Sequence, residues 1–375
     1  MKTMSDISGQ LLIAGVSVTG VGAALRGVNP ATAEKLQPEF RESSVAQEHS
    51  NMKFCGVLLF VFVGLSACAR GERTQTDASS NSEGALPTSV DTIPVHARRD
   101  LKESSSLTMS VSQPDIVFTI NDSGNEPILY ALDTAGTYRG AWRLAGATDR
   151  DWEASTRGQC MRTATGATVP PSASCIFIGE VGDNQAVHET SAIYQVEEPT
   201  VTRDTAEKTV PAEKLMFRYP DRAHDVESMY MGTDGTIFLL TKRALLSSSG
   251  TLRPSLVFAL PPSSWEAKDT VTATLVDSLP IVPGSAWLRE VTDASLSTDS
   301  KYLAVRTYVQ IFIFATDSAT GRVRHDVAPA LCNIGSVEHT HGEGISWFGT
   351  TRQLLLGSER HNQPLHRVTC ALPGR

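Results

Sequence analysis

Five acidic residues recur along the chain, each followed by small residues and then by a short apolar run. They are Glu103, Glu153, Glu227, Asp293 and Glu343. Carboxylates that gather at one place repel one another unless they are protonated or bridged by a cation. A ligand set made only of carboxylate oxygens is more typical of the hard cations Ca²⁺ and Mg²⁺ than of Zn²⁺, so the five acids predict a Ca²⁺ or Mg²⁺ site. The alternative is that each carboxylate only caps backbone N–H groups in its own repeat.

A second set of polar side chains lies near the ends of the apolar runs. We take as candidate ligand-binding residues Asp122, Asp183, Asn184, His224, Lys242, Arg306, His341 and Glu359. His339, His341 and Glu343 are spaced by two, so on a strand they share a face and can form a metal or acid–base cluster. The alternative is an ordinary histidine-bearing loop. Lys242 and Arg306 suit an anionic ligand such as a phosphate or carboxylate, or they neutralise the acids internally.

No motif for covalent catalysis or nucleotide binding accompanies these residues. The sequence contains no Gly-x-Ser-x-Gly elbow, His-Glu-x-x-His helix or phosphate loop. Gly20-Val21-Gly22 is followed by Leu25 where the third glycine of a dinucleotide loop would stand. We therefore assign no catalytic residue and expect no nucleotide cofactor.

The elements that position these residues are short strands. Apolar runs at 116–120, 176–178, 237–240, 303–305 and 354–356 each follow one of the acidic residues, and a third strand follows each run. Four strands in each of five units predict an all-β fold, a five-bladed β-propeller of four-stranded antiparallel blades. The long second and third units leave room for a sixth blade, and a β-sandwich is the alternative fold. The last unit lacks a fourth strand, which residues 92–96 are placed to supply.

Propeller geometry brings the two polar sets together. The first strand of each blade lines the central channel, and the second strand returns to the face where the first one starts. We therefore expect the acids and the polar clusters to converge at one mouth of the channel.

Glu343-Gly344-Ile345-Ser346-Trp347 resembles the Glu-Gly-Pro-x-Trp opening of gluconolactonase/regucalcin propellers, with Ile345 in place of the proline. This resemblance implies that Glu343 is a divalent-metal ligand. Residues 103–370 also resemble uncharacterised exported bacterial propellers, through segments 121–127, 151–153, 182–184 and 224–227. That resemblance implies the fold and no activity, and the similarity to phytase-like propellers is one of architecture alone.

Residues 52–68 form a candidate export signal. Lys53 and an apolar run precede Leu65-Ser66-Ala67-Cys68, which resembles the lipobox of bacterial lipoproteins. We expect Cys68 to carry the lipid and the following domain to lie outside the cytoplasm, at the outer membrane or cell surface. Residues 1–51 are interpreted as a non-native extension, with a genuine fusion as the alternative. Within them, 11–32 resemble the N-terminus of an aldehyde dehydrogenase without its catalytic segments.

Amino-acid composition indicates how the chain after Cys68 is organised. Residues 69–99 are polar and predict a flexible tether, and 100–375 predict the propeller. The net charge of −8 without a basic run argues against nucleic acid as a partner, and we expect a monomer.

Four cysteines remain after Cys55 and Cys68 are set aside: Cys160, Cys175, Cys332 and Cys370. They allow three disulfide pairings, of which we expect the local one; buried free thiols are the alternative.

Together these features predict a lipid-anchored extracytoplasmic propeller that binds a ligand or partner at a polar channel mouth, with a divalent cation. The alternative is a metal-dependent hydrolase of lactones or phosphate esters.

Overall fold

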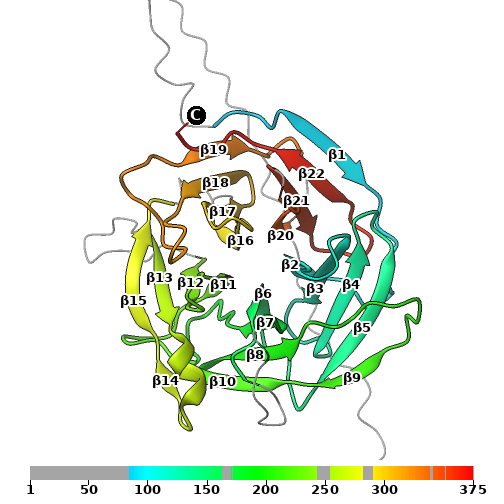
Figure 1. Cartoon of the computed structure of the whole chain (residues 1–375), viewed down its shortest axis with the longest axis vertical. Coiled ribbons are helices and arrows are strands. Elements are labelled where there is room, and N and C mark those ends of the chain that lie inside the picture. The colour runs from blue at the N-terminus through cyan, green and yellow to red at the C-terminus, as the bar shows by residue number, and fades with distance from the viewer. Residues whose placement is uncertain are drawn as a thin grey trace, which may run out of the picture. The chain divides into compact units, whose positions relative to one another are not determined.

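A computed structural model describes residues 84–162, 170, 172–242, 254–281, 290–337, 341–350 and 352–374. Their strands form five sheets around one axis, each built on four antiparallel strands, which is a five-bladed β-propeller (Figure 1). The predicted extension 1–51, signal peptide and Cys68 lie outside the described residues. No helix within the described ranges is long and apolar enough to cross a membrane.

The strands of each blade are ordered from the innermost, at the channel, to the outermost. Blade 1 contains β2 (Ser104–Met109), β3 (Ile116–Asn121), β4 (Ile128–Asp133) and β5 (Tyr138–Ala145). Blade 2 contains β6 (Trp152–Gln159), β7 (Ser174–Glu180), β8 (Ser191–Glu197) and β10 (Glu213–Arg218). Blade 3 contains β11 (Val226–Met231), β12 (Ile237–Thr241), β13 (Ser255–Leu260) and β15 (Thr274–Leu279). Blade 4 contains β16 (Val291–Leu296), β17 (Tyr302–Thr307), β18 (Gln310–Ala315) and β19 (Ala330–Asn333). Blade 5 contains β20 (Gly342–Trp347), β21 (Gln353–Ser358), β22 (Leu365–Thr369) and β1 (Ser89–Ile93).

The N-terminal segment closes the ring, as predicted, but its strand lies three residues earlier than expected. β1 pairs antiparallel with β22, so it supplies the outer strand of blade 5. Ala85 before it pairs with Cys332 of blade 4, and His96 after it pairs with Thr137 of blade 1. Residues 85–99 therefore belong to the propeller, which corrects the predicted boundary at residue 99; residues 69–83 lie outside the described ranges.

The extra length of the second and third units forms straps rather than a sixth blade. Between β8 and β10 the chain adds β9 (Lys208–Pro211), which runs parallel to β5 at the outer edge of blade 1. Between β13 and β15 it forms the 3₁₀ helix η1 (Pro262–Glu266) and β14 (Val271–Thr272), which runs parallel to β10. Each of these segments thus connects its own blade to the preceding blade, and it covers the outer edge of that preceding blade.

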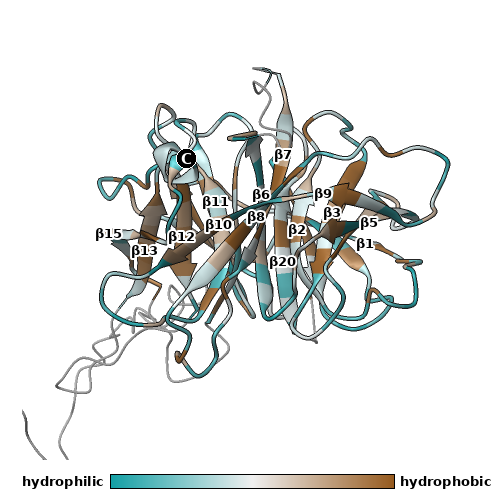
Figure 2. Ribbon diagram, turned by 90° about the horizontal axis from the view of Figure 1, so that it is seen from below, coloured by the Kyte–Doolittle hydropathy of each residue, from teal (hydrophilic) through white to brown (hydrophobic). Residues whose placement is uncertain are grey.

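Apolar side chains fill the spaces between blades. Five buried clusters in the described part of the chain each combine residues from two neighbouring blades; Phe118 of blade 1 and Trp152 of blade 2, for example, share one cluster. In the side view of Figure 2 the strands are predominantly brown and the connecting loops at both ends are largely teal. Hydrophobic burial therefore holds the blades in a ring and leaves polar residues for the two mouths.

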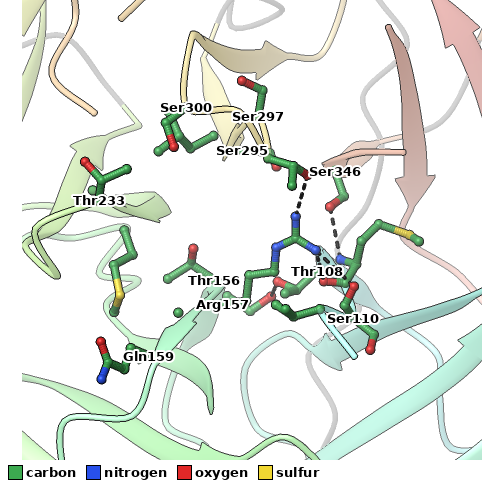
Figure 3. Close-up of a pocket in the computed structure, with 18 of the residues that line it drawn as sticks. Thr108, Ser110, Thr156, Arg157, Gln159, Thr233, Ser295, Ser297, Ser300 and Ser346 are labelled. Atoms are coloured by element: carbon green, nitrogen blue, oxygen red, sulfur yellow. Dashed lines mark hydrogen bonds between the residues drawn. The ribbon is translucent and has the colours of Figure 1, made fainter. Parts of the chain in front are cut away.

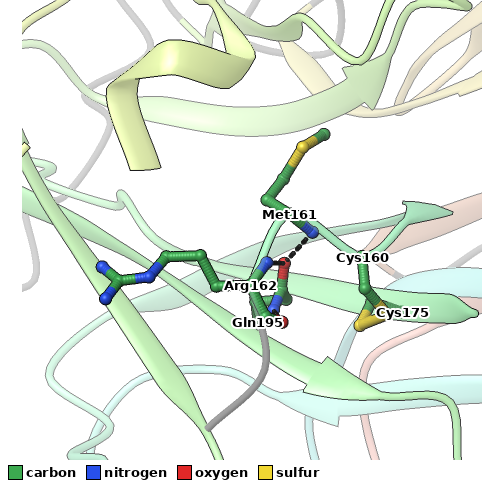
Figure 4. The surroundings of a disulfide bond; sticks show 5 residues. All are labelled: Cys160, Met161, Arg162, Cys175 and Gln195. Carbon is green, nitrogen blue, oxygen red and sulfur yellow. Dashed lines mark hydrogen bonds between the residues drawn. A yellow bond between two sulfur atoms is a disulfide. The ribbon is translucent and has the colours of Figure 1, made fainter. Parts of the chain in front are cut away.

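Both disulfides have the predicted local pairing, Cys160–Cys175 and Cys332–Cys370. The first lies within blade 2, where the buried amide of Gln195 also binds the adjacent backbone: its Oε1 accepts from Met161 N at 2.6 Å and its Nε2 donates to Arg162 O at 2.6 Å (Figure 4). The second links β19 of blade 4 to the residue after β22 of blade 5.

Candidate functional site

Each innermost strand begins with a β-bulge at the same position. In every blade one residue near the start of this strand has no partner on the second strand: Ser105, Glu153, Glu227, Thr292 and Glu343. A bulge re-aims a side chain and is frequent beside functional sites. The equivalent positions of the five blades therefore hold three glutamates, one serine and one threonine.

This register changes the position of two of the five predicted acids. Glu103 lies two residues before the bulge of blade 1, is exposed, and accepts a hydrogen bond from Asn125 Nδ2 at 2.9 Å. Asp293 lies one residue after the bulge of blade 4 and is completely buried. The structure therefore does not place Glu103 and Asp293 at the positions equivalent to the three glutamates.

Asp293 is instead a structural acceptor in the channel wall. Its Oδ2 accepts hydrogen bonds from the backbone N–H of Ile345 at 2.8 Å and of Leu107 at 3.3 Å, and its Oδ1 accepts from Ala294 N at 2.8 Å. The Ser106 hydroxyl also contacts Oδ2 at 3.3 Å. One carboxyl group thus links β16, β20 and β2, so the capping role that the sequence left open as an alternative holds for this residue and extends across blades.

The three bulge glutamates are buried close to one another. Glu153, Glu227 and Glu343 are 5%, 1% and 3% exposed. Burial raises the pKa of all three, and mutual repulsion adds to this for Glu153 and Glu343; the pKa of Glu227 reaches about 7 although Lys242 opposes the shift. Lys242 Nζ donates to Glu227 Oε1 at 2.8 Å. The Oε2 atom of Glu343 is buried without a hydrogen-bond partner among the described residues.

Glu153 also belongs to a compact carboxylate cluster. Asp122, just after β3, and Asp151, just before β6, each offer an oxygen that lies within 4.8 Å of one from Glu153 and of one another. Gly182 makes room for this cluster, because a Cβ there would lie 2.6 Å from Asp151 Cγ and 2.7 Å from Glu153 Cγ. Burial, reinforced by Asp122, raises the pKa of Asp151 to about 6. Asp122 and Asp151 are half-buried, so the cluster remains open to solvent on one side.

Several other predicted ligand-binding residues lie around this mouth. His341 precedes β20, and its Nδ1 lies 3.4 Å from Glu359 Oε2. Asp183, in the loop after β7, accepts a hydrogen bond from His188 N at 2.7 Å, and Asn184 follows it on the surface. His339 lies outside the described residues.

Two predicted ligand-binding residues have internal roles. Arg306 is completely buried, and its Nη1 donates to Gly344 O at 2.6 Å and Gly357 O at 2.7 Å, which joins blade 4 to blade 5. His224 is buried, pairs with Asp221 Oδ1 at 2.9 Å, and packs against Tyr219 and Phe258. Neither arrangement resembles an open ligand site.

Three further acids near this mouth, Asp149, Asp151 and Asp225, were not among the predicted site residues. Asp151 stands two residues before Glu153 in the sequence. Burial raises the pKa of Asp149 to about 8. Asp225 Oδ1 accepts from Asp183 N at 3.0 Å, and its buried Oδ2 has no hydrogen-bond partner in the described ranges. The acids that stand immediately before β6 and β11 in the sequence could have indicated that these residues belong to the site.

A second cavity lies at the other end of the channel. It measures about 740 Å³ and is lined by residues from the far ends of the innermost strands, such as Met109, Gln159, Leu296 and Ser346 (Figure 3). The sequence-based prediction covered only the mouth where these strands begin. A signal for the second mouth was the hydroxyl-rich end of several repeats, as in Ser295 to Ser300.

No protein-family model matches the chain, and no curated protein matches it significantly. Similar solved structures include Mala s 1, the major allergen of Malassezia sympodialis, with 10% identity, a TM-score of 0.46 and coverage of 77% of this chain and 98% of that chain. A glutaminyl cyclase of Myxococcus xanthus has 10% identity, a TM-score of 0.40 and coverage of 75% and 95%. A gluconolactonase of Xanthomonas campestris has 13% identity, a TM-score of 0.37 and coverage of 76% and 97%. Similarities at this level carry no argument about activity, and the propeller fold stands on the strand pairing itself.

Proposed function

We propose that this chain is an exported, lipid-anchored propeller that binds a divalent cation, Ca²⁺ by preference, and a ligand or partner at the acidic mouth of its channel. The observation that carries the proposal is the convergence of Asp122, Asp151 and Glu153 within 4.8 Å. Glu343, whose charge acts on Glu153, supports it independently, because its buried Oε2 has no hydrogen-bond partner among the described residues.

The donor set fits a hard cation. Calcium takes about six to eight oxygen ligands, carboxylates among them, and tolerates irregular geometry. Asp122 and Asp151 are partly exposed to solvent, whereas Glu153 is buried. Ligand oxygens and water can then complete the coordination, which is how the cation would recruit a polar partner.

The extracytoplasmic location rests on the lipobox-like segment and on the cysteines. Both disulfides of the domain are formed, and disulfides persist in oxidising compartments. Globomycin treatment of cells that express the chain tests the anchor, because it blocks lipoprotein signal peptidase. Processing at Cys68 should stop, and unchanged processing contradicts the anchor.

Metal analysis and calcium titration test the cation site. We expect calorimetry on EDTA-stripped full-length protein to show one calcium site, weakened at least about tenfold in Asp151→Asn, since each lost charge-assisted contact is worth more than about 1.4 kcal/mol. Asp269→Asn, which removes an exposed acid elsewhere, is the matched control. Absence of calcium binding, or equal binding in both variants, would reject the site.

Hydrolysis of lactones or phosphate esters is the second candidate function, and the His341–Glu359 pair favours it. A carboxylate-linked imidazole at the same mouth can accept a proton, while a bound cation would polarise a substrate oxygen. A panel of lactones and phosphate esters, assayed with calcium or EDTA, tests this. Turnover that EDTA and His341→Gln both abolish supports a hydrolase; calcium binding without turnover supports a binding module alone.

A further inference from the structure

The cavity at the opposite mouth has a different chemistry from the acidic mouth. Eleven of its 28 lining residues are serine or threonine, among them Thr156, Ser295, Ser297 and Ser300, and the side chain of Arg157 lies in its wall (Figure 3). Its volume of about 740 Å³ suits a small-molecule ligand. No aromatic ring lines the described cavity, so stacking on a sugar ring is not available there.

Arg157 is a half-buried cation that forms no direct ion pair with any described carboxylate. Its Nη1 donates to the backbone carbonyls of Met109 at 2.8 Å and Ser110 at 3.0 Å, and its Nη2 donates to Thr298 Oγ1 at 3.1 Å. Among the described residues no carboxylate lies within ion-pair distance, and Nε donates to no protein acceptor. Glu198, whose charge acts on Arg157, accepts hydrogen bonds from Ser110 and Ser112 instead.

These contacts fix the guanidinium, and the only carboxylate whose charge acts on it, that of Glu198, does so without a direct ion pair among the described residues. The two carbonyls hold one end of the group, so the edge that contains Nε keeps donors for a planar anion. A carboxylate can accept two parallel hydrogen bonds from this edge of the guanidinium, which the ammonium group of a lysine could not offer in the same geometry. Burial lowers the pKa of Arg157, which an anion in the cavity would counteract.

The remaining wall suits an organic body with hydroxyl groups. Met161 and Met231 supply an adaptable apolar side. Gly158, next to Arg157, allows Met231 to lie against the strand, because a Cβ at this position would lie 2.0 Å from Met231 Sδ. Asp234 is exposed at the rim, where its charge disfavours ligands with several negative charges.

We propose that this cavity binds a small hydroxylated monocarboxylate, with the carboxylate on Arg157 and the hydroxyl-bearing carbons among the serines, threonines and methionines. This site lies at the other end of the channel from the acidic mouth and does not depend on a cation. It is therefore independent of the proposed function.

Calorimetry on the full chain in EDTA and low salt tests the proposal. The probes are gluconate and lactate, with lactamide as the uncharged analogue and inorganic phosphate as the alternative anion. Gluconate should bind most tightly, lactate more weakly and lactamide not measurably. Stronger binding of phosphate or equal binding of lactamide would overturn the assigned ligand class.

Variants locate the binding. Arg157→Lys keeps the charge but loses the forked donors, so gluconate affinity should fall at least about tenfold. Because Arg157 also supports the β2 backbone, Thr233→Trp provides a second test: it fills the cavity from an exposed rim position and should abolish binding. Arg324→Gln, at an exposed distant site, is the control. Binding that survives Thr233→Trp, or that Asp151→Asn removes, would overturn this location.

Discussion

At the scale of single residues, the surroundings of each carboxyl group decide its role. Glu153 and Glu343 lie among other acids, and Glu343 keeps a buried oxygen without a hydrogen-bond partner in the described part of the chain. Asp293 is equally buried but receives three backbone N–H groups. A bound cation or protonation would stabilise Glu153 and Glu343, whereas backbone N–H groups already supply the hydrogen bonds that Asp293 accepts.

The raised pKa values make stability depend on pH. The pKa of Asp151 rises from 3.8 to about 6, and that of Asp149 to about 8, chiefly through burial. A carboxyl group with a raised pKa binds its proton more tightly in the folded state, so its stabilising effect is complete below about pH 4 and is lost as pH rises through the folded pKa. In EDTA we expect the free energy of unfolding to fall between pH 5 and pH 8, and calcium to reduce that fall.

Urea unfolding from pH 5 to pH 8 measures this effect. Asp151→Asn should make the decline shallower by on the order of 1 kcal/mol, after allowance for solvent screening of a half-buried group. The comparison with wild type removes the contribution of other titrating groups such as His366. An identical pH slope in the variant would contradict the role of Asp151.

Asp293 provides the contrasting prediction. Asp293→Ala leaves the N–H groups of Leu107, Ala294 and Ile345 without their acceptor, so we expect a loss of about 3 kcal/mol or more. Asp293→Asn keeps an acceptor oxygen of similar shape and should cost less. Urea unfolding gives both values, and calcium titration should be unchanged in Asp293→Asn. A large loss of calcium affinity in Asp293→Asn would show instead that Asp293 is a ligand of the cation.

At the scale of elements, the strands were predictable and their bulges were not. The apolar runs at 116–120, 176–178, 237–240, 303–305 and 354–356 became β3, β7, β12, β17 and β21, because buried β-branched and aromatic residues specify strands locally. A bulge inserts one residue into a ladder, and its place depends on pairing with the neighbouring strand. Repeat spacing alone therefore grouped Glu103 and Asp293 with the three glutamates.

The closing strand makes a prediction at this scale. A chain that begins at residue 100 lacks β1 and the apolar contacts of Ile93 and Val95, and it exposes the edge of β22. We expect it to lose about 3 kcal/mol or more from the lost burial and to aggregate through the open edge, relative to a chain that begins at residue 84. Thermal unfolding with light scattering compares the two. Equal stability would show that β1 is dispensable for closure.

At the scale of the whole molecule, the ring depends on contacts between blades. Residues 85–96 link blades 4, 5 and 1, and the Cys332–Cys370 disulfide also joins blades 4 and 5. The closure point of the propeller is thus fastened twice, by strand pairing and by a covalent bond.

Removal of the two disulfides should have unequal effects. Loss of Cys332–Cys370, with a sequence separation of 38, should cost about 4 kcal/mol, and loss of Cys160–Cys175, with a separation of 15, about 3 kcal/mol, if unfolded-state entropy dominates. Serine double variants compared by urea unfolding measure this. A larger loss for Cys160–Cys175 would show that the contacts around Gln195, rather than chain entropy, dominate.

The sequence by itself determined the innermost apolar runs and their repetition, because strand formation follows from nearby residues, and it favoured five blades and the local disulfide pairing without excluding the alternatives. The tertiary structure alone decided which acids meet. Asp122 of blade 1 joins Asp151 and Glu153 of blade 2 only because neighbouring blades pack side by side, and Asp293 is occupied only because β2 and β20 bring their N–H groups to it. It also revealed the cavity around Arg157, because strands far apart in the chain end together at one mouth.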